Sequence, residues 1–121
     1  MLNAKRVYDS TDDADGQRIL VDRLWPRGIR SEDARVDSWM KELAPSNSLR
    51  KWFGHDPEKW AEFKRRYVTE LRAADKTRAL QDIAQAAARG NVTLVYSAKD
   101  REYNNAIVLK EVISQMMVAQ Q

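Results

Sequence analysis

Two arginines, a carboxylate and an indole follow the apolar run Ile19-Leu20-Val21, within the segment Asp22-Arg23-Leu24-Trp25-Pro26-Arg27-Gly28. Charged side chains at the end of a buried strand are costly to desolvate, and proteins concentrate them where they bind or convert a ligand. A guanidinium group binds a carboxylate or a phosphate through two parallel hydrogen bonds. The segment therefore predicts an anion-binding site with these ligand-binding residues: Asp22, Arg23, Trp25 and Arg27.

A second polar group follows the apolar run Val92 to Tyr96. Ligands of open α/β sheets bind beyond the carboxyl ends of the strands, which would bring this group opposite the first one. The amino end of the next helix also attracts anions. We therefore expect further ligand contacts from Tyr96, Lys99 and Asn104. The alternative is that Arg23 pairs with a neighbouring acid and only closes the fold.

His55 is the single histidine of the chain. Because imidazole exchanges protons near neutral pH, we predict His55 and Asp100 as the catalytic residues if the site is an active site. The alternative is that His55 only occupies the turn before a helix. The chain has no cysteine, which excludes thiolate ligands, and one histidine cannot build an imidazole-rich metal site. We predict no metal and no cofactor.

Four tryptophans lie between residues 25 and 60, among basic side chains that include Lys41 and Arg50. Indole rings stack on nucleic-acid bases, so this mixture raises a less favoured alternative, a surface for nucleotides or single strands. Trp39 and Trp60 occur in apolar stripes of helical spacing, for which core packing is the other explanation. A net charge of +3 does not require a nucleic-acid partner.

The strands that must position these residues are indicated by β-branched and apolar runs. One strand is predicted at residues 19–25, where Pro26 ends the pairing, and another at residues 92–96. The Asp-rich and Gly-containing segment 9–16 indicates a turn between two extended segments.

Capping residues and apolar stripes predict the helices. Ser46 caps a short helix that ends at Gly54, and Asp56-Pro57-Glu58 begins a longer helix with an apolar stripe over residues 60–71. Two more helices are predicted at residues 76–89 and 104–118. Residues 31–43 are ambiguous between helix and strand, and their apolar spacing favours a helix.

The order of these elements and the length of 121 residues predict one domain, residues 1–121, of the α/β class. We expect a small three-layer domain with a partly parallel central sheet flanked by helices. No apolar run approaches the length of a membrane span and no signal sequence is recognisable, so we expect a cytoplasmic protein without a membrane partner.

Four ordered motifs resemble the YeaO-like branch of a bacterial domain-of-unknown-function family. They are residues 22–28, residues 41–46, residues 49–53 with His55, and residues 93–100. The resemblance covers nearly the whole chain, and it implies a small cytosolic α/β domain whose activity is not established.

The resemblance also implies a difference from many relatives in the broader family. Those relatives carry a cysteine at the end of the late strand and a Cys-His-Arg signature beyond it, where this chain has Tyr96-Ser97 and Asn104-Asn105-Ala106. Thiol chemistry is therefore not expected here. If the pocket is retained, its work falls to other side chains: Arg23, Arg27, Lys41, Arg50, His55 and Asp100.

We therefore predict a protein that binds a small anionic ligand, bearing a phosphate or a carboxylate, in an Arg/Trp/His pocket at the carboxyl ends of the strands. Whether the ligand also reacts there stays open. The alternatives are a nucleic-acid-binding or transcription-regulatory module and a protein-interaction domain. The sequence leaves the oligomeric state undetermined.

Overall fold

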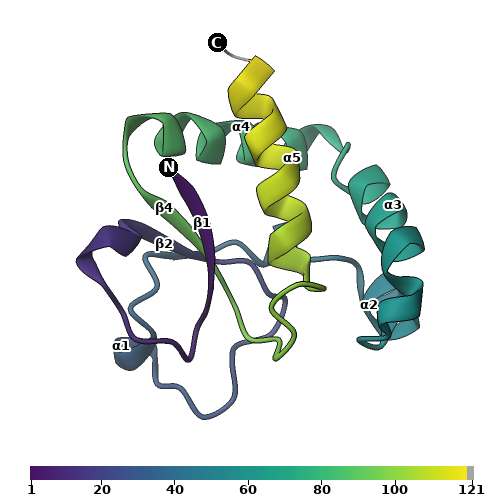
Figure 1. Cartoon of the computed structure of the whole chain (residues 1–121), viewed down its shortest axis with the longest axis horizontal. Coiled ribbons are helices and arrows are strands. Elements are labelled where there is room, and N and C mark those ends of the chain that lie inside the picture. Colours follow the sequence, from purple (N-terminus) through teal and green to yellow (C-terminus); the bar gives the residue numbers. More distant parts are fainter. Residues whose placement is uncertain (120–121) are drawn as a thin grey trace.

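The computed structural model describes residues 1–119 and contains a four-stranded sheet in the order β1-β4-β2-β3 (Figure 1). The strands are β1 (Leu2–Arg6), β2 (Gln17–Leu20), β3 (Ser38–Trp39) and β4 (Val92–Tyr96). The α-helices are α1 (Ser31–Ala34), α2 (Asn47–Phe53), α3 (Trp60–Glu70), α4 (Ala74–Arg89) and α5 (Asn105–Ala119). Three 3-10 turns join them: η1 (Asp13–Asp15), η2 (Lys41–Leu43) and η3 (Pro57–Lys59). The predicted α/β class is confirmed.

The central strand of the sheet is β4. All of its residues are buried, as expected for a parallel strand that is covered on both faces. β1 pairs with it in parallel from Leu2 opposite Val92, and β2 pairs with it in parallel from Gln17 opposite Val92. The pairing of β2 with β3 is also parallel. The sheet is thus parallel throughout, where the sequence predicted a partly parallel one.

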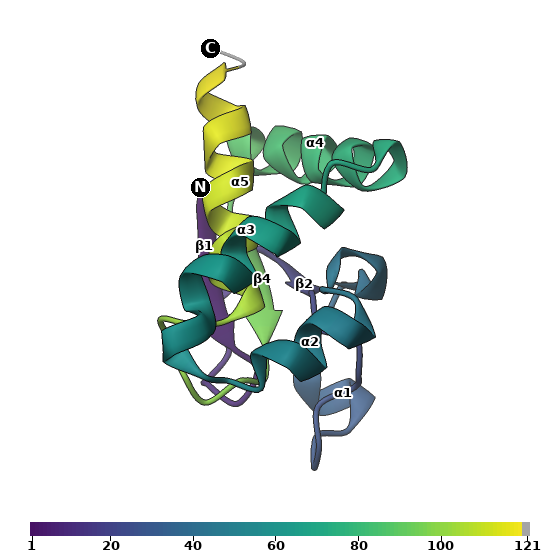
Figure 2. The ribbon, with the colours of Figure 1, turned by 90° about the vertical axis from the view of Figure 1, so that its right-hand side faces the viewer.

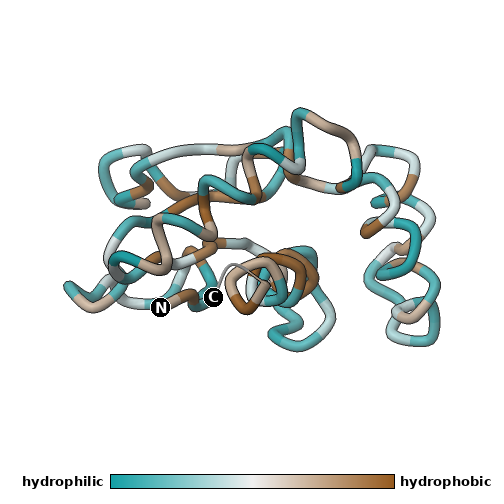
Figure 3. The backbone as a smooth tube through the Cα atoms, turned by 90° about the horizontal axis from the view of Figure 1, so that it is seen from above, coloured by the Kyte–Doolittle hydropathy of each residue, from teal (hydrophilic) through white to brown (hydrophobic). Residues whose placement is uncertain are grey.

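The two faces of the sheet carry different layers. One face, which includes Ala4, Ile19 and Leu94, packs against α2 to α5 in the main hydrophobic core. The helix α5 contacts both α3 and α4 (Figure 2). In the view from above, the helix that ends beside the C-terminus is coloured largely in the brown of hydrophobic residues (Figure 3). On the opposite face, Val95 packs with Ala34 of the short α1 and with nearby loop residues, and Thr93 donates a hydrogen bond to Asp15 O of η1. The third layer expected from the sequence is therefore thin.

A buried ion cluster fastens this thin layer to the sheet. Arg18 Nη1 lies 2.7 Å from Asp15 Oδ2, and Lys5 Nζ lies 3.0 Å from Asp15 Oδ1. Arg18 also donates hydrogen bonds to the carbonyl oxygens of Ala34 and Arg35. Because every charge has a partner, the cluster fixes η1 and α1 without leaving an unpaired buried group.

The strand predicted for residues 19–25 ends early. Val21 N still donates to Val95 O at 3.1 Å, but the next hydrogen bond between β2 and β4 no longer joins two backbone groups. The carboxylate of Asp22, instead of a backbone carbonyl, accepts the hydrogen bond from Ser97 N. The chain therefore leaves the sheet here. The side chains that follow do not alternate between the two faces of the sheet, as they would in a strand.

The helix predicted over residues 31–43 is wrong beyond Ala34. Arg35 has a left-handed conformation with φ 49°, and the segment after it runs along β2. Asp37 N donates to Arg18 O and Met40 N to Leu20 O, both at 2.8 Å. Pairing with a neighbouring strand satisfies these backbone groups, and this tertiary pairing overrides the helical spacing of the apolar residues.

The predicted caps are confirmed. Ser46 Oγ accepts a hydrogen bond from Leu49 N at 3.2 Å, and α2 ends at Gly54, whose φ is 54°. Asp56 Oδ1 accepts from Glu58 N at 3.0 Å, and η3 leads into α3. The other two predicted helices are found as α4 and α5, with bounds close to those expected. Within residues 1–119, no helix has the length and apolar character needed to cross a bilayer.

We expect Gly16→Ala to lower the free energy of unfolding by more than about 2 kcal/mol. Gly16 has φ 62°, and a Cβ there would lie 2.0 Å from Asn91 O. Gly28→Ala is the matched control, because Gly28 has φ 76° but no atom within 4 Å of the added Cβ. Urea unfolding of both variants should show a loss at Gly28 of only about 1 kcal/mol. Equal losses at the two positions would contradict the close packing described here.

Candidate functional site

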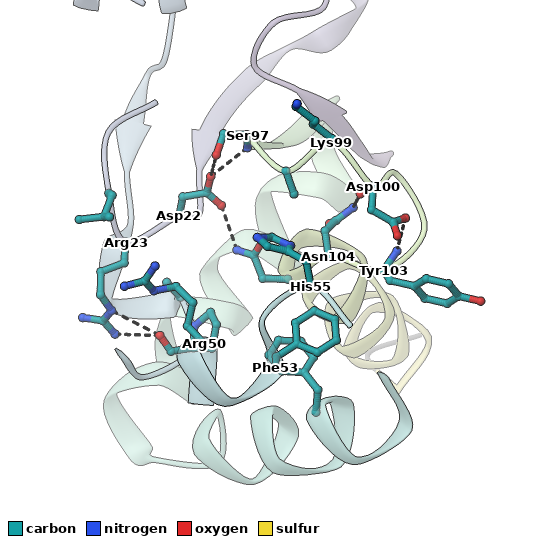
Figure 4. A pocket seen from close by; sticks show the side chains of 16 residues that line it. Asp22, Arg23, Arg50, Phe53, His55, Ser97, Lys99, Asp100, Tyr103 and Asn104 are labelled. Atoms are coloured by element: carbon teal, nitrogen blue, oxygen red, sulfur yellow. Dashed lines mark hydrogen bonds between the residues drawn. The ribbon is translucent and has the colours of Figure 1, made fainter. Parts of the chain in front are cut away.

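A cavity of about 620 Å³ opens beyond the carboxyl ends of β2 and β4. It lies between the segment after β2, the helix α2 and the loop that leads from β4 into α5 (Figure 4). The lining comprises residues 22–24, 44, 45, 50, 53, 55, 63, 97–100 and 103–105. This is the end of a parallel sheet at which α/β proteins bind their ligands.

Most of the side chains singled out from the sequence meet in this cavity. They come from three distant parts of the chain, and the topology brings them together because β2 and β4 are neighbouring parallel strands. The predicted residues that line the cavity are Asp22, Arg23, Arg50, His55, Lys99, Asp100 and Asn104. Trp25, Arg27, Lys41 and Tyr96 do not line it.

Asp22 connects three elements at one end of the cavity. Its Oδ2 accepts hydrogen bonds from Ser97 N at 2.9 Å and from Ser97 Oγ at 2.8 Å. Its Oδ1 accepts from Asn105 Nδ2 at 3.1 Å, and the same amide donates to Val21 O at 2.9 Å. One carboxylate thus connects the end of β2, the end of β4 and the first residue of α5 (Figure 4).

Two guanidinium groups lie together on one side of the cavity, Arg23 from the segment after β2 and Arg50 from α2 (Figure 4). Arg23 Nε and Nη2 donate to Pro45 O at 3.3 and 3.2 Å, which leaves the other N–H groups of its guanidinium available. In the part of the chain that the structure describes, neither arginine forms an ion pair. Two like charges without a carboxylate partner create a positive potential on this wall.

The helix α3 holds the segment that carries Pro45 and Arg50. Glu70 accepts hydrogen bonds from Ser46 N at 2.8 Å and from Ser46 Oγ at 2.7 Å. The buried hydroxyl of Tyr67 donates to Leu43 O, and burial raises the pKa of this phenol well above its usual value. The phenol therefore stays protonated, and it serves as a fixed donor that anchors the loop.

The opposite wall comes from the loop before α5. Asp100 Oδ1 accepts hydrogen bonds from Tyr103 N at 3.0 Å and from Glu102 N at 2.9 Å. These bonds, assisted by the nearby His55, lower the pKa of Asp100 below its ordinary value. Asp100 is therefore ionised at neutral pH and is a weak base there. His55 is exposed in the turn after α2, with φ 58°, and Lys99 is exposed as well.

The floor of the cavity is apolar. The rings of Phe53 and Phe63 stack with their centroids 4.2 Å apart, and the ring of His55 lies 6.2 Å from that of Phe53. Ala44 and Pro45 are buried on one side, while Leu24 is 62 % exposed and lines the mouth. Sequence reasoning missed these apolar contributors, because nothing in their local pattern distinguishes a cavity lining from a core.

The four predicted residues that do not line the cavity lie on other parts of the molecule. After Asp22 the chain turns away from β2, so Trp25 packs on the opposite face of the sheet, where its Nε1 donates to Ile29 O at 2.8 Å. Arg27 is exposed beyond this turn. Lys41 lies over the ring of Trp39, with Nζ 5.1 Å from the centroid. Tyr96 is buried in the core, and burial raises its pKa.

The four tryptophans do not form one platform. Trp25 and Trp39 contact each other edge to face, with centroids 5.5 Å apart. The ring of Trp52 lies close to two cations, Arg66 at 4.4 Å and Lys59 at 5.1 Å. Trp60 packs in the aromatic core with Phe53, Phe63 and Tyr103. Contacts within the protein thus occupy each indole, and the arrangement does not favour base stacking on a shared surface.

The side chains of the cavity suit binding of an anion better than binding of a metal. Arg23, Arg50 and Lys99 provide permanent positive charges, and arginine in particular matches planar or tetrahedral oxyanions. Within residues 1–119, no group of three His, Cys, Asp or Glu side chains is placed to hold a metal ion.

Comparison with known proteins identifies relatives over almost the whole length. Residues 1–121 match a protein-family model described as the inactive DUF488-N3 subclade. The uncharacterized protein YeaO of Escherichia coli is 44% identical over 111 residues, which cover 91% of this chain and 94% of YeaO. Uncharacterized proteins of Mycobacterium tuberculosis and Mycobacterium bovis are each 42% identical over 113 residues, 93% of both chains. No solved structure matches the chain significantly.

We expect Asp22→Asn to lower the free energy of unfolding by about 1–3 kcal/mol. An amide supplies only one acceptor oxygen, so its NH₂ group would face either Ser97 N or Asn105 Nδ2, which are both donors. Asp82→Asn, at an exposed position of α4, is the control and should change stability by less than about 0.5 kcal/mol. Urea unfolding measures both. A loss at Asp22 no larger than that at Asp82 would rule out the proposed connecting role.

We expect the ion pair between Asp9 and Arg101 to make stability depend on acid pH. Arg101 Nη1 and Nη2 lie 2.9 Å from the two carboxylate oxygens of Asp9, and these hydrogen bonds lower the pKa of Asp9 from 3.8 to about 2. A depressed folded-state pKa stabilises the protein above about pH 4, and this contribution disappears as the pH falls toward about 2. Because Arg101 is largely exposed, solvent screens the pair and the contribution to stability should be small.

The pH dependence is measured by comparing the wild type with Asp9→Asn in urea unfolding at several pH values. The stability difference between the two proteins should be present at neutral pH and shrink on acidification below about pH 4. A difference that is constant across this range would show that the pair does not link the loops before β2 and α5.

Proposed function

This chain belongs to the inactive DUF488-N3 subclade, a YeaO-like family, and we propose that its cavity is a binding site for a small anionic ligand. The ligand carries a phosphate or a carboxylate group, which occupies the side of the cavity that holds Arg23 and Arg50. The proposed function is binding and not catalysis. It agrees with the description of the subclade as inactive.

The observation that carries this proposal is the pair of guanidinium groups on one wall. Arg23 and Arg50 come from separate elements, and neither has a carboxylate partner among residues 1–119. Bringing two positive charges together costs free energy unless an anion lies between them. A phosphate or carboxylate would accept hydrogen bonds from both guanidinium groups and remove their mutual repulsion.

The acids in the cavity do not cancel this potential. Both oxygens of Asp22 accept hydrogen bonds from Ser97 and Asn105, and Asp100 accepts from two backbone amides. These donors stabilise the carboxylates locally, so the arginines are not needed for that purpose. With Lys99 on the rim, three permanent cations face two carboxylates, and the excess charge is positive.

Catalysis by His55 and Asp100 receives less support from the geometry. Asp100 has a lowered pKa, which makes it a poor proton donor at neutral pH. Ser97 Oγ donates to Asp22 Oδ2, so this hydroxyl is engaged in holding the fold. His55 lines the cavity from an exposed turn, where it adds positive charge whenever it is protonated.

We expect Arg50→Gln to weaken the binding of phenyl phosphate at least about tenfold, because a charge-assisted hydrogen bond is lost. Lys51→Gln is the matched control, since Lys51 is the exposed neighbour on α2 but does not line the cavity. Isothermal titration calorimetry with the wild type and both variants measures the dissociation constants. If no binding occurs, or if the two substitutions weaken it equally, the proposal is wrong.

A further inference from the structure

We infer that the ligand is an anion with an apolar body, such as an aryl or alkyl phosphate or carboxylate, and not a polyhydroxylated compound such as a sugar phosphate. This inference rests on the proposed anion site and concerns the part of the ligand beyond its charged group. It is drawn from two properties of the lining: Asp22, Ser97, Asn104 and Asn105 are engaged in hydrogen bonds within the protein, and much of the remaining lining is apolar.

The polar side chains opposite the arginines have few groups to offer a ligand. Asp22 accepts three hydrogen bonds from the protein, and Ser97 Oγ donates one of them. Asn105 Nδ2 donates to both Val21 O and Asp22 Oδ1, which uses the donor capacity of its amide. The hydrogen bonds that hold the fold together thus consume the donors on this wall.

The same holds nearer to α5. Asn104 is 2 % exposed; its Nδ2 donates to Asp100 O at 2.9 Å, and its Oδ1 accepts from Ile107 N at 3.1 Å. Asp100 Oδ1 receives two backbone amides. In the described part of the chain, no buried side-chain nitrogen or oxygen lacks a partner, so the buried end of the cavity offers a ligand hydroxyl no unpaired side-chain group.

The rest of the lining provides contacts for an apolar body. Phe53 and Phe63 form a stacked pair at the floor, Ala98 lies on the β4 side, and Leu24 stands at the mouth. In Figure 4, Phe53 lies below His55, between the arginine side of the cavity and the loop of Asp100. A ligand whose anionic group binds the arginines therefore extends its body over this apolar floor.

The two kinds of ligand differ in what they would lose on binding. A hydroxyl that enters the buried end of this cavity gives up its hydrogen bonds to water and finds no unpaired side-chain partner there, which costs roughly 1–3 kcal/mol for each group. An aryl or alkyl group instead removes apolar surface of the ligand and of the lining, chiefly the exposed Leu24, from water. A cavity of about 620 Å³ has room for a ring in addition to the anionic group.

Three probes that share a phosphate group test the inference: inorganic phosphate, phenyl phosphate and ribose 5-phosphate. Calorimetric titration of the full chain should show phenyl phosphate binding at least about tenfold more tightly than the other two. Binding of all three probes should weaken in Arg50→Gln and stay unchanged in the control Lys51→Gln.

A second variant isolates the apolar contact. Leu24→Ser replaces an exposed side chain at the mouth, so folding is little affected, and it should weaken phenyl phosphate about threefold while leaving inorganic phosphate unchanged. Val118→Ser is the matched control, because Val118 is 69% exposed on α5 and does not line the cavity. It should change neither dissociation constant.

The outcomes separate this inference from the proposed function. If all three probes bind with similar, Arg50-dependent affinity, or if ribose 5-phosphate binds most tightly, the apolar-body inference is overturned and the anion site stands. The inference is also overturned if Leu24→Ser weakens inorganic phosphate as much as phenyl phosphate. If no probe binds, the anion site itself is rejected. Selective, Arg50-dependent binding of phenyl phosphate supports both.

Discussion

The carboxylate of Asp22 is the interaction on which the candidate site depends. It receives the backbone amide and hydroxyl of Ser97 just beyond β4 and the side-chain amide of Asn105 at the start of α5. A side-chain acceptor here takes the place of a backbone carbonyl, so β2 stops pairing and the chain is released from the sheet. The ends of β2 and β4 and the beginning of α5 are thereby held at fixed positions around one cavity.

Because the chain leaves the sheet at Asp22, the polar residues that follow lie on both sides of the sheet. Arg23 stays on the side of the sheet that carries α2 to α5, where it donates to Pro45 O and faces Arg50. Trp25 passes to the other face and packs near Ile29 and Trp39. Residues that are close in sequence therefore serve different surfaces: Asp22, Arg23 and Leu24 line the cavity, and Trp25 packs on the other face of the sheet.

The chemistry of the cavity follows from a difference between its two walls. Asp22, Ser97, Asn104 and Asn105 bond to one another or to the backbone, while the arginines opposite have no acidic partner in the part of the chain described. The helix α3 maintains this asymmetry through Glu70 and Tyr67, which hold the loop that leads into α2 and so position Arg50. In the proposed site, the arginines therefore bind the charged group of the ligand, and a different, apolar part of the lining contacts its body.

Local chemistry by itself determined the capped helices, the central strand and the polar strand ends. Ser46 and Asp56 cap helices through bonds to amides within three residues, and Val92 to Tyr96 form a buried strand because every side chain is apolar or can be satisfied there. These features depend on neighbours in sequence, which a pattern can show. The parallel neighbourhood of β2 and β4 then made it possible to expect Arg23, His55 and Asp100 around one cavity.

Only the tertiary structure decided the rest. Residues 35–40 run along β2 although their spacing is helical, because backbone pairing with a distant strand outweighs local periodicity. The positions of Trp25, Arg27, Lys41 and Tyr96 outside the cavity, and of Phe53 and Phe63 within it, depend on where the chain leaves the sheet and on how α3 packs. Those outcomes are set by contacts between residues far apart along the chain, for which the sequence carries no local signal.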